Sequence, residues 1–286
     1  MYAVGEMDRA LVPNGLILKF GVIVIPLRIG IQLASLKQPL KQALMMASRL
    51  GAQGIEIDAR EEIKPKELTQ TALRQLRKLL DDLNLRVCAV NFRTRRGYGD
   101  AEDLDRRVDA TKAAMQMAYS LGASVVINQV GAIPSDSEGP VWDRLRMSLD
   151  DLGRYGQKVG AMLAAETGAE SGADLARLLA ALPEGSLGIN FDPGNLIMNS
   201  HSVEEASNLL GRHVLHIHAK DAVRDLARRR GIEVEMGRGS VDFASLLAQL
   251  EEYGYQGYIT VKRDNAAHPV AEIEQSIEYL KELFRS

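Results

Sequence analysis

Three short stretches of the chain place acidic and imidazole side chains directly after short apolar runs. They read "AAETG", "GINFDPGN" and "HIHAKD", and they carry Glu166, Asp192, His216 and His218. Carboxylate oxygens and imidazole nitrogens are suitable ligands for Mn²⁺, Mg²⁺, Co²⁺ or Zn²⁺. Each signal has an ordinary structural explanation when taken singly, because an aspartate before Pro193 fits a turn. Taken together at successive strand ends, they predict a divalent metal site.

The elements that must position these residues repeat eight times along the chain. Segments such as "PLKQALMMASRLG" have apolar residues at helical spacing and end on glycine. The predicted strands between them are residues 28–32, 54–58, 86–91, 124–128, 161–166, 187–192, 213–218 and 257–262. No Pro- or Ser-rich linker interrupts the series, so residues 28–286 are predicted to form one α/β domain, a (β/α)8 TIM barrel. Residues 1–27 are predicted to be an N-terminal extension. An open doubly wound sheet would need a glycine-rich turn after the first strand, and "IGIQLASL" has none.

Alternation along the strands predicts which side chains face the barrel interior. One parity is apolar and is expected to pack against the helices: Ile29, Ile31, Ile55, Ile57, Cys88, Val90, Val125, Ile127, Ile189, Phe191, Leu215, Ile217, Ile259 and Val261. The other parity is polar and collects toward the C-terminal strand ends: Gln32, Glu56, Asp58, Asn91, Asn128, Glu166, Asn190, Asp192, His216, His218, Thr260 and Lys262. A barrel places its active site at that end. Burying so many polar groups without a ligand or mutual pairing is costly, which favours a functional site over a polar plug.

These same stretches carry a resemblance to a known family. The chain resembles the sugar phosphate isomerase/epimerase family of the xylose-isomerase-like TIM-barrel superfamily in "RIGIQLASLKQPLKQALMMASRLGAQGIEIDAR", "AAETG", "GINFDPGN", "HIHAKD" and "GRGSVDFASLLAQLEEYGYQGYITV". The resemblance implies an isomerase or epimerase that transfers a proton next to the carbonyl of a small sugar, polyol ketone or sugar phosphate. It implies Glu166, Asp192 and His218 as ligands of a divalent metal, Glu166 as the catalytic base and Arg224 as a substrate-binding residue.

The last predicted strand departs from the family pattern. In related epimerases a glutamate at the end of the eighth strand is the fourth metal ligand, and this chain has Lys262 there. An ammonium has no lone pair to donate to a metal. Two alternatives therefore stay open beside the metal-dependent isomerase. One is a metal-free variant in which Lys262 replaces the metal as a catalytic residue, such as a lyase or dehydratase, and the other is a non-catalytic sugar-binding protein. A replacement requires Lys262 to lie within salt-bridge distance of Glu166 or Asp192.

Further polar residues are candidates for binding the substrate. Glu56, Asn128, Asn190 and His216 are predicted to point into the barrel at its C-terminal face. Arg238, in "GRGSVDF", precedes a predicted helix, and an arginine beside a helix N-terminus could bind a phosphate group. An ordinary capping turn is an equally good interpretation of that stretch.

Composition and charge argue against other classes of protein. The formal net charge is −3 at pH 7, so no general attraction to nucleic acid is expected. Apurinic-site endonucleases share this barrel but use many histidines, whereas this chain has five, and Asn195 stands where that class would want one. The single cysteine fits a reducing compartment, and no apolar run is long enough to span a bilayer. We therefore expect a cytoplasmic protein that binds a small-molecule sugar or sugar phosphate and neither nucleic acid nor membrane. A homo-oligomer is compatible with the sequence.

Overall fold

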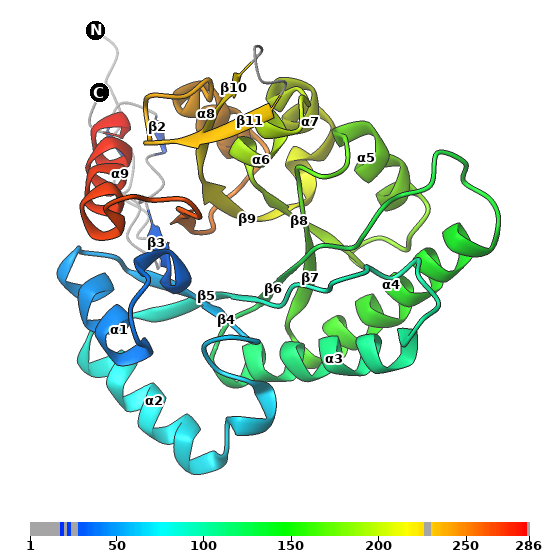
Figure 1. Cartoon of the computed structure of the whole chain (residues 1–286), viewed down its shortest axis with the longest axis horizontal. Coiled ribbons are helices and arrows are strands. Elements are labelled where there is room, and N and C mark those ends of the chain that lie inside the picture. Colours follow the sequence, from blue (N-terminus) through cyan, green and yellow to red (C-terminus); the bar gives the residue numbers. More distant parts are fainter. Residues whose placement is uncertain (1–17, 20–21, 24–27, 226–229, 285–286) are drawn as a thin grey trace, which may run out of the picture.

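Eight parallel strands close into a barrel in the computed structural model of the chain (Figure 1). The structure describes residues 18–19, 22–23, 28–225 and 230–284. In barrel order the strands are β12 (Ile259–Val261), β3 (Ile29–Gln32), β4 (Gly54–Asp58), β5 (Arg86–Asn91), β6 (Val125–Asn128), β7 (Met162–Glu166), β8 (Gly188–Phe191) and β9 (Val214–Ala219). Each coincides with a predicted strand to within two residues at either end. The predicted TIM barrel is therefore confirmed.

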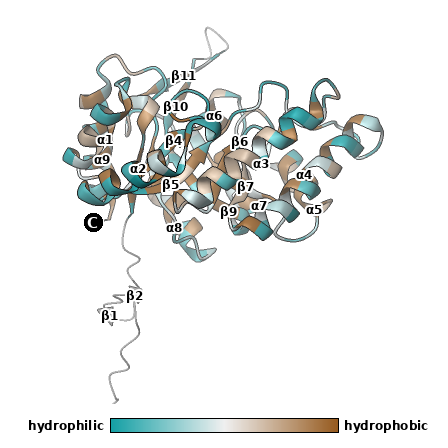
Figure 2. Cartoon of the chain, turned by 90° about the horizontal axis from the view of Figure 1, so that it is seen from below, coloured by the Kyte–Doolittle hydropathy of each residue, from teal (hydrophilic) through white to brown (hydrophobic). Residues whose placement is uncertain are grey.

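The helices lie outside the strands and connect them (Figure 1). They are α1 (Leu40–Arg49), α2 (Gln70–Asp82), α3 (Leu104–Ser120), α4 (Pro140–Val159), α5 (Gly172–Ala180), α6 (Pro193–Met198), α7 (Val203–Leu210), α8 (Phe243–Glu252) and α9 (Pro269–Leu283). Several begin at a side-chain cap, which explains where they start. Thr69, Ser171 and Ser202 accept hydrogen bonds from backbone N–H groups in the first turns of α2, α5 and α7. Hydrophilic helix faces point outward in Figure 2. Among the described residues, no helix has the length and apolar character needed to cross a membrane.

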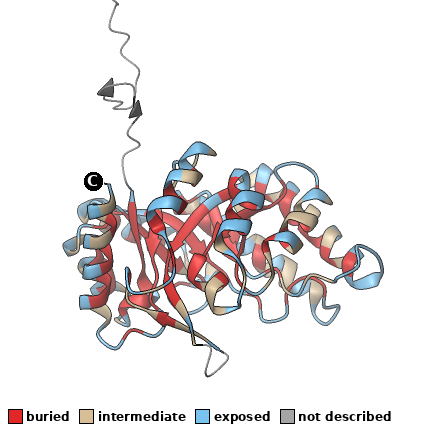
Figure 3. Ribbon diagram, turned by 90° about the horizontal axis from the view of Figure 1, so that it is seen from above, coloured by how far each residue is buried: buried red, intermediate tan, exposed pale blue. Residues whose placement is uncertain are grey.

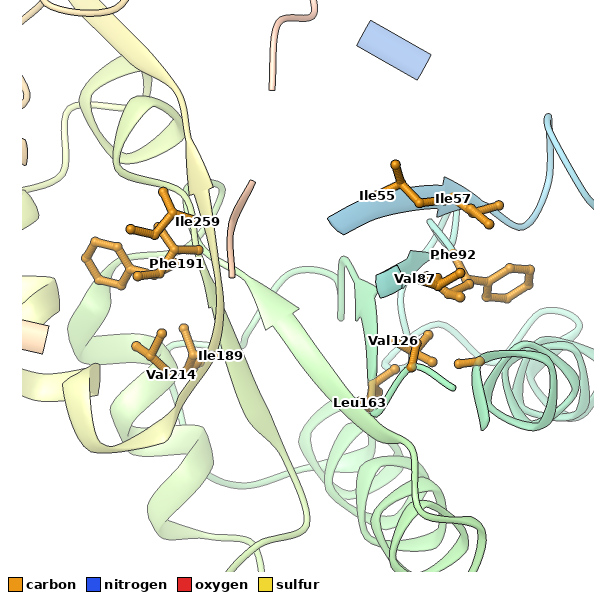
Figure 4. Packing of buried hydrophobic residues seen from close by; sticks show 14 of the residues in the cluster. Ile55, Ile57, Val87, Phe92, Val126, Leu163, Ile189, Phe191, Val214 and Ile259 are labelled. Carbon is orange, nitrogen blue, oxygen red and sulfur yellow. The ribbon is translucent and has the colours of Figure 1, made fainter. Parts of the chain in front are cut away.

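The main hydrophobic core lies between the outer face of the barrel and the helices. Ile55, Ile57, Val126, Leu163 and Ile189 belong to one buried cluster with the helix residues that cover them (Figure 4). The barrel strands are buried along almost their whole length, whereas exposed residues lie mainly on the outer helix faces and loops (Figure 3). The barrel interior contains a second, smaller hydrophobic cluster and the polar residues at the C-terminal strand ends.

The predicted alternation is wrong on two strands that carry a bulge. Ile55 and Glu56 pair with Val87 and Ala89, so Cys88 is an extra residue in β5. Cys88 Sγ lies 3.5 Å from the interior Thr260 Oγ1, so the cysteine does not pack against the helices. In β9 the same kind of register shift leaves Leu215 as the extra residue, and its side chain is exposed.

On β6 the prediction assigned the two faces the wrong way round. Val125 and Ile127 were expected to face the helices, but they form the small interior cluster with Ala89 and Ala164. Val126 belongs to the helix-packed core instead. The strand is apolar on both faces, so alternation in the sequence could not choose between them. Asn128 has the same parity as Val126, which matters for the site.

A β-hairpin that the sequence did not predict is inserted after β9. It consists of β10 (Asp221–Asp225) and β11 (Arg230–Val234), which pair antiparallel with each other and not with the barrel (Figure 2). The hairpin is fixed to the end of β12 by a buried arginine: Arg263 Nη1 donates to Glu233 Oε1 (2.8 Å), and the guanidinium also pairs with Glu272.

A separate pair of two-residue strands, β1 (Leu18–Lys19) and β2 (Val22–Ile23), precedes the barrel. The rest of the predicted extension over residues 1–27 lies outside the described residues.

Candidate active site

Lys262 stands at the centre of the polar cluster, directly after β12. Its Nζ lies 2.6 Å from Glu166 Oε1 and 3.1 Å from Asp192 Oδ2. It lies 3.4 Å from His218 Nδ1. All four side chains are at most 4 % exposed. The structure therefore brings together the four residues that the sequence singled out for metal binding and catalysis, and Lys262 meets the salt-bridge condition for a replacement.

The barrel strands hold these side chains in place. Glu166 is the last residue of β7, and His218 lies on β9, with β8 between the two strands. Asp192 follows β8 and caps α6, since its Oδ1 accepts a hydrogen bond from the backbone N–H of Asn195 at 2.8 Å. The backbone N–H of Lys262 donates to Ala219 O at 3.2 Å, which ties the end of β12 to β9. The convergence thus follows from the parallel order of the strands.

Glu56 forms a second contact with His218 on the side away from Lys262. His218 Nε2 lies 2.7 Å from Glu56 Oε2, while His218 Nδ1 lies 3.1 Å from Glu166 Oε1. Gln32 and Asn91 each donate a hydrogen bond to the other oxygen of Glu56, Oε1. Glu56 also lines the cavity described below, so its predicted role in binding substrate stays a prediction.

Asn190 and His216 continue the network deeper into the barrel. Asn190 lies between the two imidazoles, with Oδ1 2.9 Å from His216 Nδ1 and Nδ2 3.0 Å from His218 Nδ1. His216 Nε2 lies 2.8 Å from Thr260 Oγ1. Both residues are buried, so their contacts are with protein groups that position His218.

The buried charges shift one another's pKa values. Burial alone would lower the pKa of the Lys262 ammonium, but the carboxylates of Glu166 and Asp192 outweigh it and hold the pKa above its usual range. Burial likewise disfavours a charged His218, yet Glu56, Asp192 and Glu166 raise its pKa to about 10. His216 has no such carboxylate partner in contact, and burial lowers its pKa to about 3. The cluster therefore combines carboxylates with two cations at neutral pH.

The raised pKa of His218 predicts a loss of stability at alkaline pH. The folded-state pKa of about 10 exceeds the ordinary value of 6.5, so the imidazolium stabilises the fold fully below about pH 6.5. That contribution is lost as the pH rises toward 10. We expect the free energy of unfolding, measured by urea titration across this range, to fall more steeply for the unmodified protein than for His218→Gln. Parallel pH curves for the two proteins would contradict the assignment.

A cavity of about 180 Å³ opens beside the cluster at the barrel mouth. It is lined by Gln32, Ala34, Ser35, Glu56, Asp58, Asn91, Arg93, Arg263 and Asp264. Near it, Gln129 Nε2 lies 3.2 Å from Glu166 Oε2. Neither Arg93 nor Gln129 was predicted as a site residue. Gln129 directly follows β6, a position that marks it as a strand-end residue, whereas nothing in the sequence separated Arg93 from its neighbouring arginines.

Three predicted substrate-binding residues lie away from this centre. Asn128 donates to Phe92 O and accepts from Thr94 Oγ1, because its side chain lies on the helix-facing side of β6. Arg224 is exposed on β10. Arg238 is exposed and pairs with Glu235, with Nε 3.0 Å from Oε2. The structure gives these three no contact with the four central residues.

The predicted phosphate site at "GRGSVDF" is already filled by a protein carboxylate. Asp221 is fully buried, and its Oδ2 accepts backbone hydrogen bonds from Gly237 (3.0 Å) and Gly239 (2.8 Å). Its Oδ1 accepts another from Val241. Asp242 caps the following helix through Ser245 N. The backbone donors that a phosphate would need are therefore used, and the capping interpretation is the correct one.

The donor atoms of Glu166, Asp192 and His218 are of the right type for a divalent cation. They lie within 4.8 Å of one another, as do those of a second group, Glu56, His216 and His218. However, the Lys262 Nζ lies within 3.4 Å of all three donors of the first group. The residues present, with Lys262 among them, therefore do not fit a metal in the central position.

Residues 44–283 match the family of xylose isomerase-like TIM barrels, and the chain belongs to this family. Among curated proteins, the inosose dehydratase of Clostridium beijerinckii is 22% identical over 278 residues, which cover 85% of this chain and 89% of that protein. A solved xylose isomerase domain protein from Planctomyces limnophilus superposes with a TM-score of 0.75 at 26% identity, over 84% of this chain and 91% of the other. A D-tagatose 3-epimerase-like protein gives a TM-score of 0.70 at 20% identity, over 91% and 99%. The last likeness is one of fold alone.

Proposed function

We propose that the protein is an enzyme that removes a proton next to the carbonyl group of a small polyhydroxylated ketone, such as a sugar, an inosose or one of their phosphates. The observation that carries the proposal is the contact of one carboxylate, Glu166, with two cationic groups at the mouth of the barrel. A base beside cations is what enolate formation requires, because the proton leaves a carbon whose electrons move onto an oxygen. The similarity to an inosose dehydratase supports this substrate class.

In this proposal Glu166 is the catalytic base. Burial would raise the pKa of Glu166. At rest the Lys262 ammonium outweighs this effect and holds the pKa of Glu166 well below its usual range. The resting carboxylate is therefore a weak base. A substrate carbonyl that accepts a hydrogen bond from Lys262 in place of Glu166 would weaken that ion pair and make Glu166 more basic. The same ammonium would then stabilise the enolate oxygen as the proton moves to Glu166.

Two outcomes of the enolate are chemically open. Return of the proton to the carbon from the opposite face gives an epimer, and its delivery to the next carbon gives an isomer. Loss of the hydroxyl group on the neighbouring carbon, protonated by a nearby acid, gives a dehydrated product and water. An epimerase that uses two carboxylates needs one on each face of the substrate, and Lys262 stands where the resemblance implied the second. This substitution favours the dehydratase as a second candidate, since elimination needs only one base.

Incubation of the protein with a panel of ketoses, inososes and their phosphates in D₂O tests the proposal. We expect deuterium from solvent on the carbon next to the carbonyl of one compound class, observed by NMR. Water loss from the same compound would assign a dehydratase, and a new stereoisomer would assign an epimerase. Binding of a panel member without any exchange or product would contradict catalysis and leave a sugar-binding protein.

A further inference from the structure

The position between the three metal-type donors belongs to a side chain of the protein itself. Glu166 Oε1, Asp192 Oδ2 and His218 Nδ1 surround one point from β7, β8 and β9, and Lys262 Nζ lies 2.6, 3.1 and 3.4 Å from them. The first two separations are ion-pair distances for an ammonium, and the third brings the ammonium next to the imidazole ring. A cation coordinated by the same three atoms would have to occupy the same small volume.

Lys262 is held in this position from both sides along the chain. Its backbone N–H donates to Ala219 O, and the backbone N–H of the next residue, Arg263, donates to Ser35 Oγ at 2.9 Å. The Arg263 side chain is buried between Glu233 and Glu272. The backbone around Lys262 is thus fixed to Ser35 just after β3, to β9 and to the β10–β11 hairpin. With the backbone fixed, only rotation of the lysine side chain itself could remove the ammonium from the centre.

The charge of the site gives a second, independent argument against a divalent cation beside Lys262. An ammonium at the centre carries the single positive charge that a divalent cation together with one additional carboxylate would carry. Glu56 and the protonated His218 offset each other, so Glu166 and Asp192 face the same central charge in either case, without a metal. A divalent cation added beside a buried ammonium would instead bring two positive centres together in a region from which water is excluded.

We infer that the Lys262 ammonium occupies the metal position of the barrel, so that the protein keeps three metal-type donors but excludes divalent cations and works without one. The inference deepens the proposed function by assigning the group that polarises the substrate oxygen. Its test measures metal binding directly, so it can fail or succeed whether or not a substrate is found.

The decisive experiment compares metal binding before and after removal of the ammonium. The probes are Mn²⁺ and Zn²⁺, measured by isothermal titration and by elemental analysis after dialysis. For the unmodified protein we expect far less than one ion per chain. Lys262→Met removes the charge, and Lys262→Glu adds a third carboxylate as a fourth ligand. In both variants we expect one ion per chain, with a dissociation constant tighter by roughly 100-fold or more than that of the unmodified protein.

Lys220→Met is the matched control. Lys220 is also a buried lysine near the site, but its Nζ pairs with Asp264 Oδ2 (2.6 Å) and Asn195 Oδ1 (3.0 Å) and stands outside the three donors. Its loss should leave Mn²⁺ binding as weak as in the unmodified protein. If Lys220→Met binds Mn²⁺ as tightly as Lys262→Met, loss of any positive charge suffices and the inference is overturned.

The remaining outcomes also decide the question. One tightly held ion per chain in the unmodified protein overturns the inference, because the lysine would then coexist with the metal. Lys262→Met and Lys262→Glu variants that fold, as judged by circular dichroism, but bind no ion overturn it as well, because the ammonium would not be what excludes the metal. Should neither variant fold, the unmodified protein still decides: one ion per chain overturns the inference, and its absence at millimolar Mn²⁺ supports it.

Discussion

Glu166→Gln is expected to lower the rate of solvent deuterium exchange into the substrate by about 10²–10⁴-fold, the usual contribution of a general base. The amide keeps the size of the side chain and its contact with Gln129, but it cannot accept the proton. It also leaves the Lys262 ammonium with Asp192 as its remaining carboxylate partner. The measurement is the exchange rate by NMR for whichever ketone the panel identifies.

Gln129→Leu is the matched control for this variant. Gln129 Nε2 donates to Glu166 Oε2 at 3.2 Å, whereas Lys262 pairs with the other oxygen of that carboxylate, Oε1. Its loss should change the orientation of Glu166 without removing the base, so exchange should fall far less. Thermal unfolding of both variants shows whether a loss of activity merely reflects a loss of fold. Exchange that continues undiminished in a folded Glu166→Gln protein would remove Glu166 from the role of base.

Asp221→Ala is expected to lower the free energy of unfolding by about 3–5 kcal/mol, the largest stability effect that we predict from a single substitution. The Asp221 carboxylate is fully buried and accepts backbone hydrogen bonds from Ala222, Gly237, Gly239 and Val241. Alanine would leave these four N–H groups without their acceptor. Urea titration of the two proteins measures the difference.

Asp242→Ala is the control for this second variant. Asp242 is a carboxylate of the same loop, but it is exposed and caps only the first turn of α8 through Ser245. We expect its removal to cost about 1 kcal/mol. If both substitutions had the same small effect, the carboxylate of Asp221 would not be what organises the loop, and the account of why no phosphate site forms there would fail.

The strand order and the central residues were predictable because they depend on local signals. Each barrel strand is a short apolar run bounded by turn residues, and Glu166, Asp192, His218 and Lys262 all stand at or next to the ends of such runs. In a barrel of parallel strands those ends must converge, so position along the strand was sufficient to place them. The departure at Lys262 was visible in the sequence for the same reason.

The face on which a side chain lies was less predictable, because it depends on register. Cys88 and Leu215 are each the extra residue of a bulge, and nothing in the sequence marks a bulge in an apolar strand. Asn128 was misplaced because β6 is apolar on both faces. The loop of Arg238 was mispredicted for a similar reason. Its backbone N–H groups donate to Asp221, which lies in a hairpin that the sequence did not predict.

The hydrogen bond between Arg263 and Ser35 joins residues 228 positions apart, and it has a consequence for how the chain folds. β12 pairs with both β3 and β9, so the barrel remains an open sheet until the C-terminal part of the chain has been synthesised. Contacts this distant in sequence form late, because the loop they close is long. Until β12 docks, Glu166 and Asp192 also lack the ammonium that balances them. Docking of β12 therefore both closes the barrel and brings the Lys262 ammonium to the two carboxylates. We expect these two events to occur as one cooperative step at the end of folding.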